Sequence, residues 1–293
     1  MIFLIFSILS SAAIYVIFKY IDRLKISTFD VIIINYLTAS VLGFLLSEPQ
    51  ADIFPLHQNQ WFPYAILIGV LFILMFVVIA KSSQVVGIAI TTVSNKMSVI
   101  IPITFSIFID PLDQLTNLKA TGIILAIVAV FLSVYRKRKV EFDPRNIYLP
   151  IILFLGMGVV DSIVKYAQQF YVDDDVLPLF TVILFIMAAL SGLITKLFRR
   201  TPFNALLSPR VLFWGILLGI SNYGSLYFVI KALNYKDVIG NNIDGSVVFG
   251  INNLGIIALS VVIGLLIFKE KILKINWIGI LISLIAIYIL SIT

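Results

Sequence analysis

The sequence places a lysine and several side-chain amides inside segments that are otherwise almost wholly apolar. Lys96 lies near the centre of the apolar stretch 86–109 with Asn95 beside it, and Asn252 and Asn253 lie in a second such stretch. An ionisable side chain deep in a membrane costs at least about 2.5–3.5 kcal/mol on insertion scales, so it usually faces a cavity or a partner. Lys96 is too central for its ammonium to reach water easily. These residues are therefore candidates for binding an anionic group such as a carboxylate, with the amides supplying hydrogen bonds.

A second pair of ionisable residues, Asp161 and Lys165, lies in the apolar stretch 147–167 at a spacing of four residues. On a helix this spacing brings the two side chains together on one face. One interpretation is a self-neutralised couple. Another gives Asp161 the role of counter-ion or proton site, since carboxylates at such depths titrate readily. A third is an ion pair between Lys96 and Asp161 that only holds helices together.

Four further groups at membrane depth are weaker candidates: Asn35, Asn222, Tyr223 and Tyr227. They would line a cavity, with the tyrosines packing against the carbon skeleton of a substrate, although ordinary helix packing explains each of them as well. Lys19 lies nearer the end of its stretch, and we expect its ammonium to snorkel to water. Pro102, in the same stretch as the central lysine, cannot donate a backbone hydrogen bond and should interrupt that helix.

Composition assigns the chain to the membrane proteins. Of its 293 residues, 61% are hydrophobic and only 12% are charged, and the mean hydropathy is +1.10. A soluble protein of this length needs a polar, hydrated exterior and cannot bury so much apolar surface. The net charge of +6 is then explained by basic cytoplasmic loops rather than by nucleic-acid binding. The apolar N-terminus lacks a basic region and a small-residue cleavage site, which predicts a retained first helix.

Hydropathy predicts ten transmembrane helices joined by short connections, so the expected fold class is an all-α polytopic membrane protein. The predicted spans are 2–20, 29–47, 61–80, 86–109, 118–135, 147–167, 177–197, 211–231, 242–267 and 274–291. A hydrophilic hinge falls between the fifth and sixth spans. It divides the chain into two predicted five-helix domains, residues 1–137 and 146–293.

The two halves of the sequence resemble each other. A shift of 157 residues places Asn95 on Asn252 and Gly122 on Gly279, and a shift of 146 matches the ends of the first and sixth spans. These matches keep one order of elements, as an internal duplication should. Because five helices is an odd number, the second copy enters the membrane in the opposite sense, which predicts two inverted repeats. A chance resemblance between apolar helices is the alternative.

The loop charges predict an orientation in the membrane. Fifteen of the 21 Lys and Arg residues lie in odd-numbered connections, Lys196 among them, and three lie in even-numbered ones. The positive-inside rule therefore places the odd connections in the cytoplasm and both termini outside. The polar clip 269–271 is interpreted most simply as a cytoplasmic turn and orientation signal.

The sequence offers little for catalysis. Its one histidine, His57, is predicted in an extramembrane loop, and it has no cysteine, no metal-ligand spacing and no phosphate- or dinucleotide-binding fingerprint. We therefore expect no enzymatic activity, no metal site and no cofactor, with coupling to a proton or another ion left open. The expected partners are a small-molecule substrate and membrane lipids, not nucleic acid, and a homodimer is left open.

Ten short-looped helices in two fives resemble the EamA-type members of the drug/metabolite transporter superfamily. The resemblance rests on residues 94–97 with Pro102, and above all on the stretch 267–279, an acidic clip followed by a glycine-bearing last helix. Asp113 and Gly122 are a fainter counterpart in the first half. Nearly the whole chain is covered.

The resemblance implies a central cavity lined mainly by the first four helices of each repeat. It also implies export or exchange of amino acids, other metabolites or drugs without ATP. Members of the family are commonly expected to have cytoplasmic termini, which differs from the orientation that the loop charges predict here. The leading hypothesis is a secondary transporter in the cytoplasmic (inner) membrane that works by alternating access. The alternatives are a non-transporting membrane scaffold and a passive pore.

Overall fold

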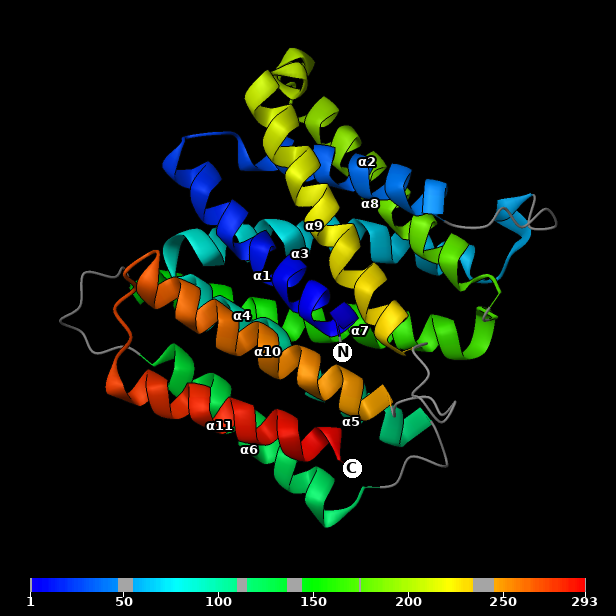
Figure 1. Cartoon of the computed structure of the whole chain (residues 1–293). Coiled ribbons are helices and arrows are strands. Elements are labelled where there is room, and N and C mark those ends of the chain that lie inside the picture. Colours follow the sequence, from blue (N-terminus) through cyan, green and yellow to red (C-terminus); the bar gives the residue numbers. More distant parts are fainter. Residues whose placement is uncertain are drawn as a thin grey trace. The chain divides into compact units, whose positions relative to one another are not determined.

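The computed structural model describes residues 2–46, 55–109, 115–135, 144–173, 175–233 and 245–292 (Figure 1). The helices in these ranges are α1 (Ile2–Arg23), α2 (Thr28–Leu46), α3 (Phe62–Val85), α4 (Ile88–Met97), α5 (Ile100–Ile109), α6 (Asn117–Val134), α7 (Tyr148–Tyr171), α8 (Leu177–Phe198), α9 (Pro209–Leu233), α10 (Gly245–Leu266) and α11 (Lys274–Ser291). Short 3-10 turns, η2 (Leu56–Gln58), η3 (Pro144–Ile147) and η4 (Phe203–Leu207), lie in the connections.

Ten of the helical segments in the described ranges are long and apolar enough to cross a membrane, with α4 and α5 together forming one of them. The predicted all-α class and the ten predicted candidate spans are therefore confirmed, which is consistent with a multi-pass membrane protein. The agreement extends to the positions of the spans, because an apolar run of about 20 residues is what a membrane-crossing helix requires.

The fourth span is broken in its middle. Residues 98–99 separate α4 from α5, as the proline in this span predicts. Pro102 has no N–H to donate to the Ser98 carbonyl, and the Ile101 amide donates to that carbonyl instead, at 3.0 Å. The Ser98 hydroxyl in turn donates to the Asn95 carbonyl. Two carbonyls at the end of α4 are thus satisfied locally, without an α-helical hydrogen bond.

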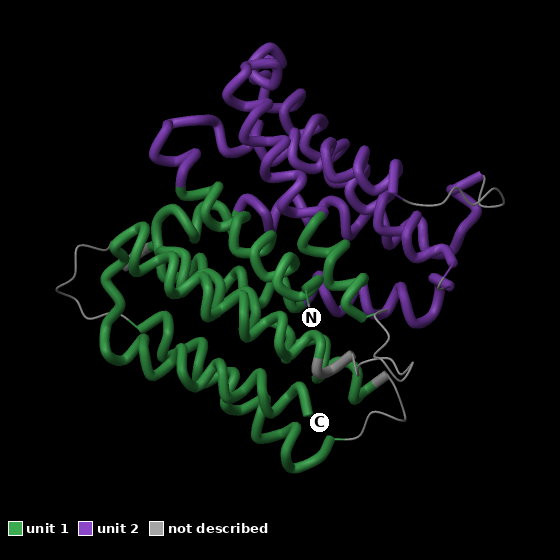
Figure 2. Tube along the Cα trace, in the orientation of Figure 1, with its two compact units in different colours: residues 1–19, 78–158, 224–293 green, residues 20–77, 159–223 purple. Residues whose placement is uncertain are grey.

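The helices form two compact units, which Figure 2 colours separately. Unit 1 comprises residues 1–19, 78–158 and 224–293, and unit 2 comprises residues 20–77 and 159–223. Each unit takes segments from both halves of the sequence. The units follow packing whereas the predicted domains follow chain order, so the division into two repeats stays a prediction.

Unit 1 is built around the packing of α6 along α11, with α4 against both α6 and α10. The contacting faces of α6 and α11 carry small residues at spacings of three and four, which lets the two backbones approach closely. On α6 these buried residues are Gly122, Ala126, Ala129 and Ser133, and on α11 they are Gly279, Ser283 and Ala286. Larger aliphatic side chains of α4 and α10 close the core, among them Val93, Met97, Ile257 and Val261.

The two glycines of this contact should respond differently to substitution by alanine. A methyl group at Gly279 would collide with the Ser133 backbone nitrogen and lie 2.9 Å from the Ala129 carbonyl oxygen, whereas one at Gly122 would meet the Leu290 side chain at 2.8 Å. A side chain can turn away, but helix backbone cannot. We expect Gly279→Ala to lower the free energy of unfolding in a detergent titration by about 1–3 kcal/mol, and Gly122→Ala by much less. Equal losses would contradict this account of the contact.

Unit 2 is organised by the packing of α2 along α8. A buried ion pair joins these helices, with the Lys196 Nζ 2.6 Å from the Asp30 Oδ1. From the sequence, Lys196 is expected among the charges of the cytoplasmic connections. That expectation is wrong, because the residue lies in the last turn of α8 and its side chain is buried. Asp30, in the first turn of α2, draws the ammonium inward, because a buried carboxylate needs a positive partner.

An aromatic cluster in the same unit joins the start of α3 to the end of α7. The Tyr64 ring stacks on Tyr171 at a centroid distance of 5.2 Å and lies 5.7 Å from Tyr166. Tyrosines gather at the membrane–water interface, where the ring is apolar and the hydroxyl is hydrated. Their position at helix ends agrees with that pattern.

Candidate functional site

Polar side chains lie near the break between α4 and α5 in unit 1. Some are on α4 itself, and others are on α10, which packs against α4. Asn95 and Lys96 lie in the last turn of α4 and are half-buried. The Asn95 Nδ2 donates to the hydroxyl oxygen of Tyr15 on α1 at 2.7 Å. A positive side chain is favoured at the C-terminal end of a helix, where the last carbonyls carry partial negative charge. At the break an amide and a phenol are thus in contact, and Lys96 follows that amide in the sequence.

Asn252 and Asn253 reach the same level from α10, which packs on α4. α4 begins and α10 ends beside the Glu270 carboxylate. The Ile88 amide donates to this carboxylate at 2.7 Å, and a methyl group at Gly264 would lie 2.7 Å from it. The two helices therefore run in opposite chain directions. At a rise of about 1.5 Å per residue, the break and Asn253 each lie roughly 15–17 Å from these helix ends. The amides of α10 are level with the break in α4.

Unpaired polar atoms concentrate on these two helices. Among the described residues, the buried side-chain atoms without a hydrogen-bond partner are the Ser94 hydroxyl on α4, and the Asn252 Oδ1 and the Ser260 hydroxyl on α10. Asn252 is only 6% exposed. A buried polar atom left unpaired costs about 1–3 kcal/mol, so each of the three is a candidate contact for water or a bound molecule. The Asn252 Oδ1 is an acceptor and would take a donor from such a molecule.

The remaining predicted site residues lie on α2, α7 and α9. Asp161 and Lys165 on α7 are half-buried and belong to unit 2, whereas Lys96 belongs to unit 1. Tyr223 on α9 also belongs to unit 2, whereas Tyr227, one turn further along the same helix, falls in unit 1 with the Lys231 ammonium 5.5 Å from its ring.

Asn35 is fully buried on α2 and has a packing role available to it. With its amide oriented to satisfy its neighbours, its nitrogen donates to the Leu218 carbonyl on α9 at 3.2 Å and its oxygen accepts from the Tyr36 amide. Both partners belong to unit 2. This agrees with the packing interpretation that the sequence left open.

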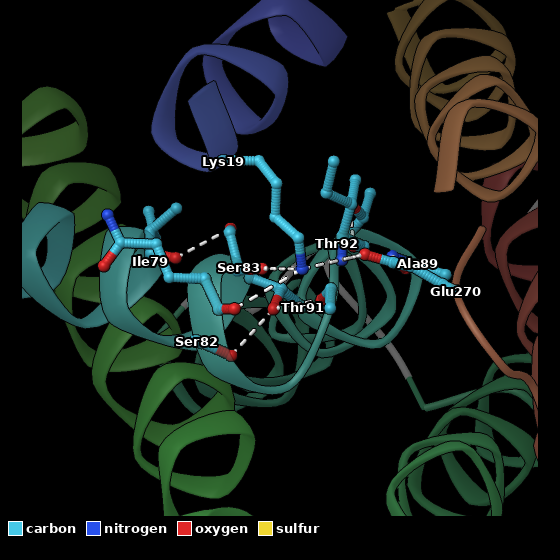
Figure 3. A network of polar contacts seen from close by, with 11 residues as sticks. Lys19, Ile79, Ser82, Ser83, Ala89, Thr91, Thr92 and Glu270 are labelled. Atoms are coloured by element: carbon cyan, nitrogen blue, oxygen red, sulfur yellow. Dashed lines mark hydrogen bonds and ion pairs between the residues drawn. The ribbon is translucent and has the colours of Figure 1, made fainter. Parts of the chain in front are cut away.

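Lys19 corrects another expectation. Its ammonium does not snorkel to water but donates to the carbonyls of Ser83 at 3.1 Å and Gln84 at 3.4 Å, and lies 3.3 Å from the Glu270 Oε1 (Figure 3). The carbonyls at the C-terminal end of α3 lack partners within their own helix, which is why they attract a cation. Ser82 and Thr91, joined by a 2.7 Å hydroxyl contact, tie α3 to α4 beside this pair.

Glu270 lies in the turn between α10 and α11, and it has a further role that the sequence did not predict. Its carboxylate accepts hydrogen bonds from the amides of Ile88 at 2.7 Å and Ala89 at 3.3 Å, at the start of α4. The residue is therefore the acceptor for the first turn of a helix that lies far from it in the sequence. Nothing in the local pattern of the clip 269–271 indicates that partner.

The described residues contain no group of three or more His, Cys, Asp or Glu side chains that could hold a metal ion. Two residues of the candidate site, Tyr15 and Ser94, were missed in the sequence. Neither a tyrosine nor a serine costs enough in an apolar helix to stand out, so only the spatial contact with Asn95, or the missing partner, identifies them.

No family model matches this chain. An uncharacterized protein of Haemophilus influenzae is 29% identical to it over 297 residues, which cover 98% of this chain and 96% of that protein. The similarity runs through both halves and through every helix of the candidate site. The name of that protein assigns it no activity.

Proposed function

We propose that this protein is a secondary transporter of the EamA type that moves a small metabolite, amino acid or drug-like compound by alternating access. The observation that carries the proposal is the coincidence of unpaired buried atoms with a broken helix. The Ser94 hydroxyl and the Asn252 Oδ1 lack partners in the described part of the chain, and both lie on the helices that meet at the break in the fourth span. Discontinuous membrane helices typically line the binding sites of secondary transporters.

The chemistry of the site suggests how a substrate would be held. Lys96 attracts an anionic group such as a carboxylate, and the Asn252 Oδ1 accepts a hydrogen bond from a donor group on the same molecule. Asn95 and Asn253 offer further hydrogen bonds at the same level. Asp161 is proposed as counter-ion or proton site, which would couple transport to an ion gradient.

Helix boundaries support the inverted repeats that such a mechanism requires. The shift of 157 residues carries α6 (Asn117–Val134) onto α11 (Lys274–Ser291), and residues 88–109, which include α4 and α5, onto α10 (Gly245–Leu266). The contacts are reciprocal as well: Gly122 meets Leu290, and Gly279 meets Ser133, which the same shift interchanges. Two elements that exchange places in this way are expected of a two-fold axis. We place the protein in the cytoplasmic membrane with both termini outside.

A scaffold without transport is the rival, and the buried pair of Lys196 and Asp30 gives it some support. That pair holds α8 to α2 in unit 2 and needs no substrate. The chain therefore does use a buried lysine for packing, and Lys96 must be tested separately.

Replacing Lys96 by alanine should reduce transport at least tenfold without changing the thermal unfolding temperature. A metabolite that stabilises the purified protein against heat identifies a ligand, because a molecule that binds only the native state must stabilise it. Uptake of that ligand is then measured in proteoliposomes with and without a proton gradient. Lys81→Ala is the matched control, because Lys81 is an exposed lysine at the end of α3.

Wild-type transport by a normally folded Lys96→Ala protein would overturn the assignment of the site. Ligand movement that never saturates would indicate a passive pore. Ligand binding without any movement across the bilayer, whatever the gradient, would indicate a scaffold.

A further inference from the structure

Glu270 is placed by the way α10 ends. Lys269 adopts a left-handed backbone conformation, with φ 53°, and the Glu270 amide donates to the Gly264 carbonyl at 2.9 Å. This bond spans six residues, one more than the bond of a Schellman ending, and it closes a wider turn after the last helical residue. The chain therefore turns back along α10 and directs the glutamate side chain inward, where it is only 12% exposed.

The carboxylate of Glu270 fills a pocket that fits it closely. Two backbone amides, those of Ile88 and Ala89, donate to its oxygens, and the Lys19 ammonium lies 3.3 Å away. Glycines leave the space: a methyl group at Gly87 would lie 2.9 Å from the Oε2, and one at Gly264 would lie 2.7 Å from it. The first turn of a helix also favours a negative charge.

Gly87 itself provides no capping side chain for α4, and its φ of 117° is one that favours glycine. The first turn of α4 therefore takes its acceptor from a residue 182 positions away in the sequence. An N-terminal cap of this kind normally comes from the neighbouring residue. A distant acceptor fixes the helix relative to another part of the fold as well as stabilising the helix itself.

The segments that Glu270 joins are the ones that carry the candidate site. Tyr15 lies one turn from Lys19 on α1, and Asn95 lies two turns from Ile88 on α4. Glu270 is connected to α10 through its own backbone amide. A single carboxylate thus fastens α1 and α4 to the end of the helix that carries Asn252.

We propose that Glu270 is a positioning residue: by holding the first turn of α4 and the Lys19 ammonium, it sets where Tyr15 and Asn95 meet at the substrate site. This proposal rests on the function proposed above. Removing a residue that only stabilised the fold would lower the unfolding temperature and leave the packing around the site unchanged. Removing a positioning residue would also change how α4 is packed beyond its first turn.

The absence of cysteine from the sequence makes that packing measurable with a single introduced thiol. Ser94→Cys places the thiol on α4, and Ser260→Cys places it on α10; both serines are fully buried and the replacement is nearly isosteric. The rate of alkylation by N-ethylmaleimide is measured for each protein in lipid nanodiscs, with and without Glu270→Ala. We expect Glu270→Ala to raise the rate at position 94 at least tenfold. The rate at position 260 should stay within twofold, because alanine retains the backbone bond to Gly264.

Sodium acetate provides the rescue arm, since acetate has the carbon atoms and charge that Glu270→Ala removes. Compared with sodium chloride at equal ionic strength, acetate should restore both the unfolding temperature of the Glu270→Ala protein and the slow alkylation at position 94. It should leave the parent protein unchanged. Glu270→Gln, which keeps an oxygen for the Ile88 amide but loses the charge, should have an intermediate effect and serves if the alanine variant does not fold.

Two results would overturn the proposal. Unchanged alkylation at position 94 in a variant with a lowered unfolding temperature would show that Glu270 only caps α4. Equal acceleration at positions 94 and 260 would show general loosening of unit 1. Neither measurement uses a substrate, so the transport assay and this test can fail independently of each other.

Discussion

Replacing Lys196 by methionine is expected to lower the free energy of unfolding by about 3–5 kcal/mol, the usual cost of leaving a buried charge without its partner. The Lys196 Nζ lies 2.6 Å from the Asp30 Oδ1, and the two side chains are 2% and 7% exposed. Methionine fills most of the lysine's volume, so little of the loss comes from a cavity. The loss comes from the Asp30 carboxylate, which stays in an apolar environment with no water to solvate it.

The double variant Lys196→Met with Asp30→Leu separates the charge effect from packing. Two apolar side chains of similar volume often replace a buried ion pair at little cost, so the double variant should recover most of the stability. Unfolding is followed by circular dichroism in a titration of mixed micelles with sodium dodecyl sulfate. Lys81→Met, at an exposed lysine, should change the free energy by no more than about 0.5 kcal/mol. A double variant as unstable as the single one would show that the pair does not work in this way.

The positions of the helices could be predicted from the sequence because a membrane span is a local property. The last span, predicted at 274–291, is observed as α11 at Lys274–Ser291, and the fourth, predicted at 86–109, contains α4 and α5. α1 continues to Arg23 although hydropathy placed its end at residue 20, since a helix can extend past the apolar run into the interface. In α1, hydropathy therefore fails to predict only the last turn.

Partners far apart in the sequence could not be predicted. Lys196 is 166 residues from Asp30, and near Arg199 and Arg200 it resembles one more loop charge. Its position in the last helical turn, facing an acid in the first turn of another helix, becomes visible only when α2 and α8 are packed. Glu270 is a similar case, because its partners are the distant Lys19 and two backbone amides, which have no sequence signature.

In the candidate site, the residues that could be predicted are those whose side chains are costly to transfer into an apolar helix. Lys96 and the asparagines stand out in the sequence because a charge or an amide in an apolar helix has a large transfer cost. Tyr15 has an apolar ring and gives no such signal. The interruption of the fourth span could be anticipated from Pro102. That α10 stays continuous agrees with the repeat alignment, which places Leu259 opposite this proline.

Asn276, another residue that the sequence did not single out, holds the end of α6 to the start of α11. Its Nδ2 donates to the carbonyls of Ser133 and Tyr135 at 2.8 Å and of Leu132 at 3.1 Å, and its Oδ1 accepts from the Leu273 amide. The side chain is fully buried. The last carbonyls of a helix have no partner within it, and here the two N–H groups of a single amide are shared among three carbonyls at and just after the end of α6. The repeat alignment places Lys119 at the corresponding position of α6, so the two ends of the contact differ in the side chain found there.

Asn276→Ala should therefore cost about 2–4 kcal/mol in the same detergent titration, because the bonds from two N–H groups are lost and each buried carbonyl left unpaired costs about 1–3 kcal/mol. Asn276→Asp distinguishes the loss of the donor from the loss of volume. The aspartate is nearly isosteric and keeps an oxygen for the Leu273 amide, but it turns an acceptor toward three carbonyl oxygens, so it should be at least as damaging as alanine. Asn59→Ala, at a half-buried amide whose Nδ2 donates to the nearby Leu56 carbonyl, should cost less than about 1 kcal/mol. A stable Asn276→Asp protein would mean that α6 and α11 are held by their small-residue contact, and that the shared cap contributes little to it.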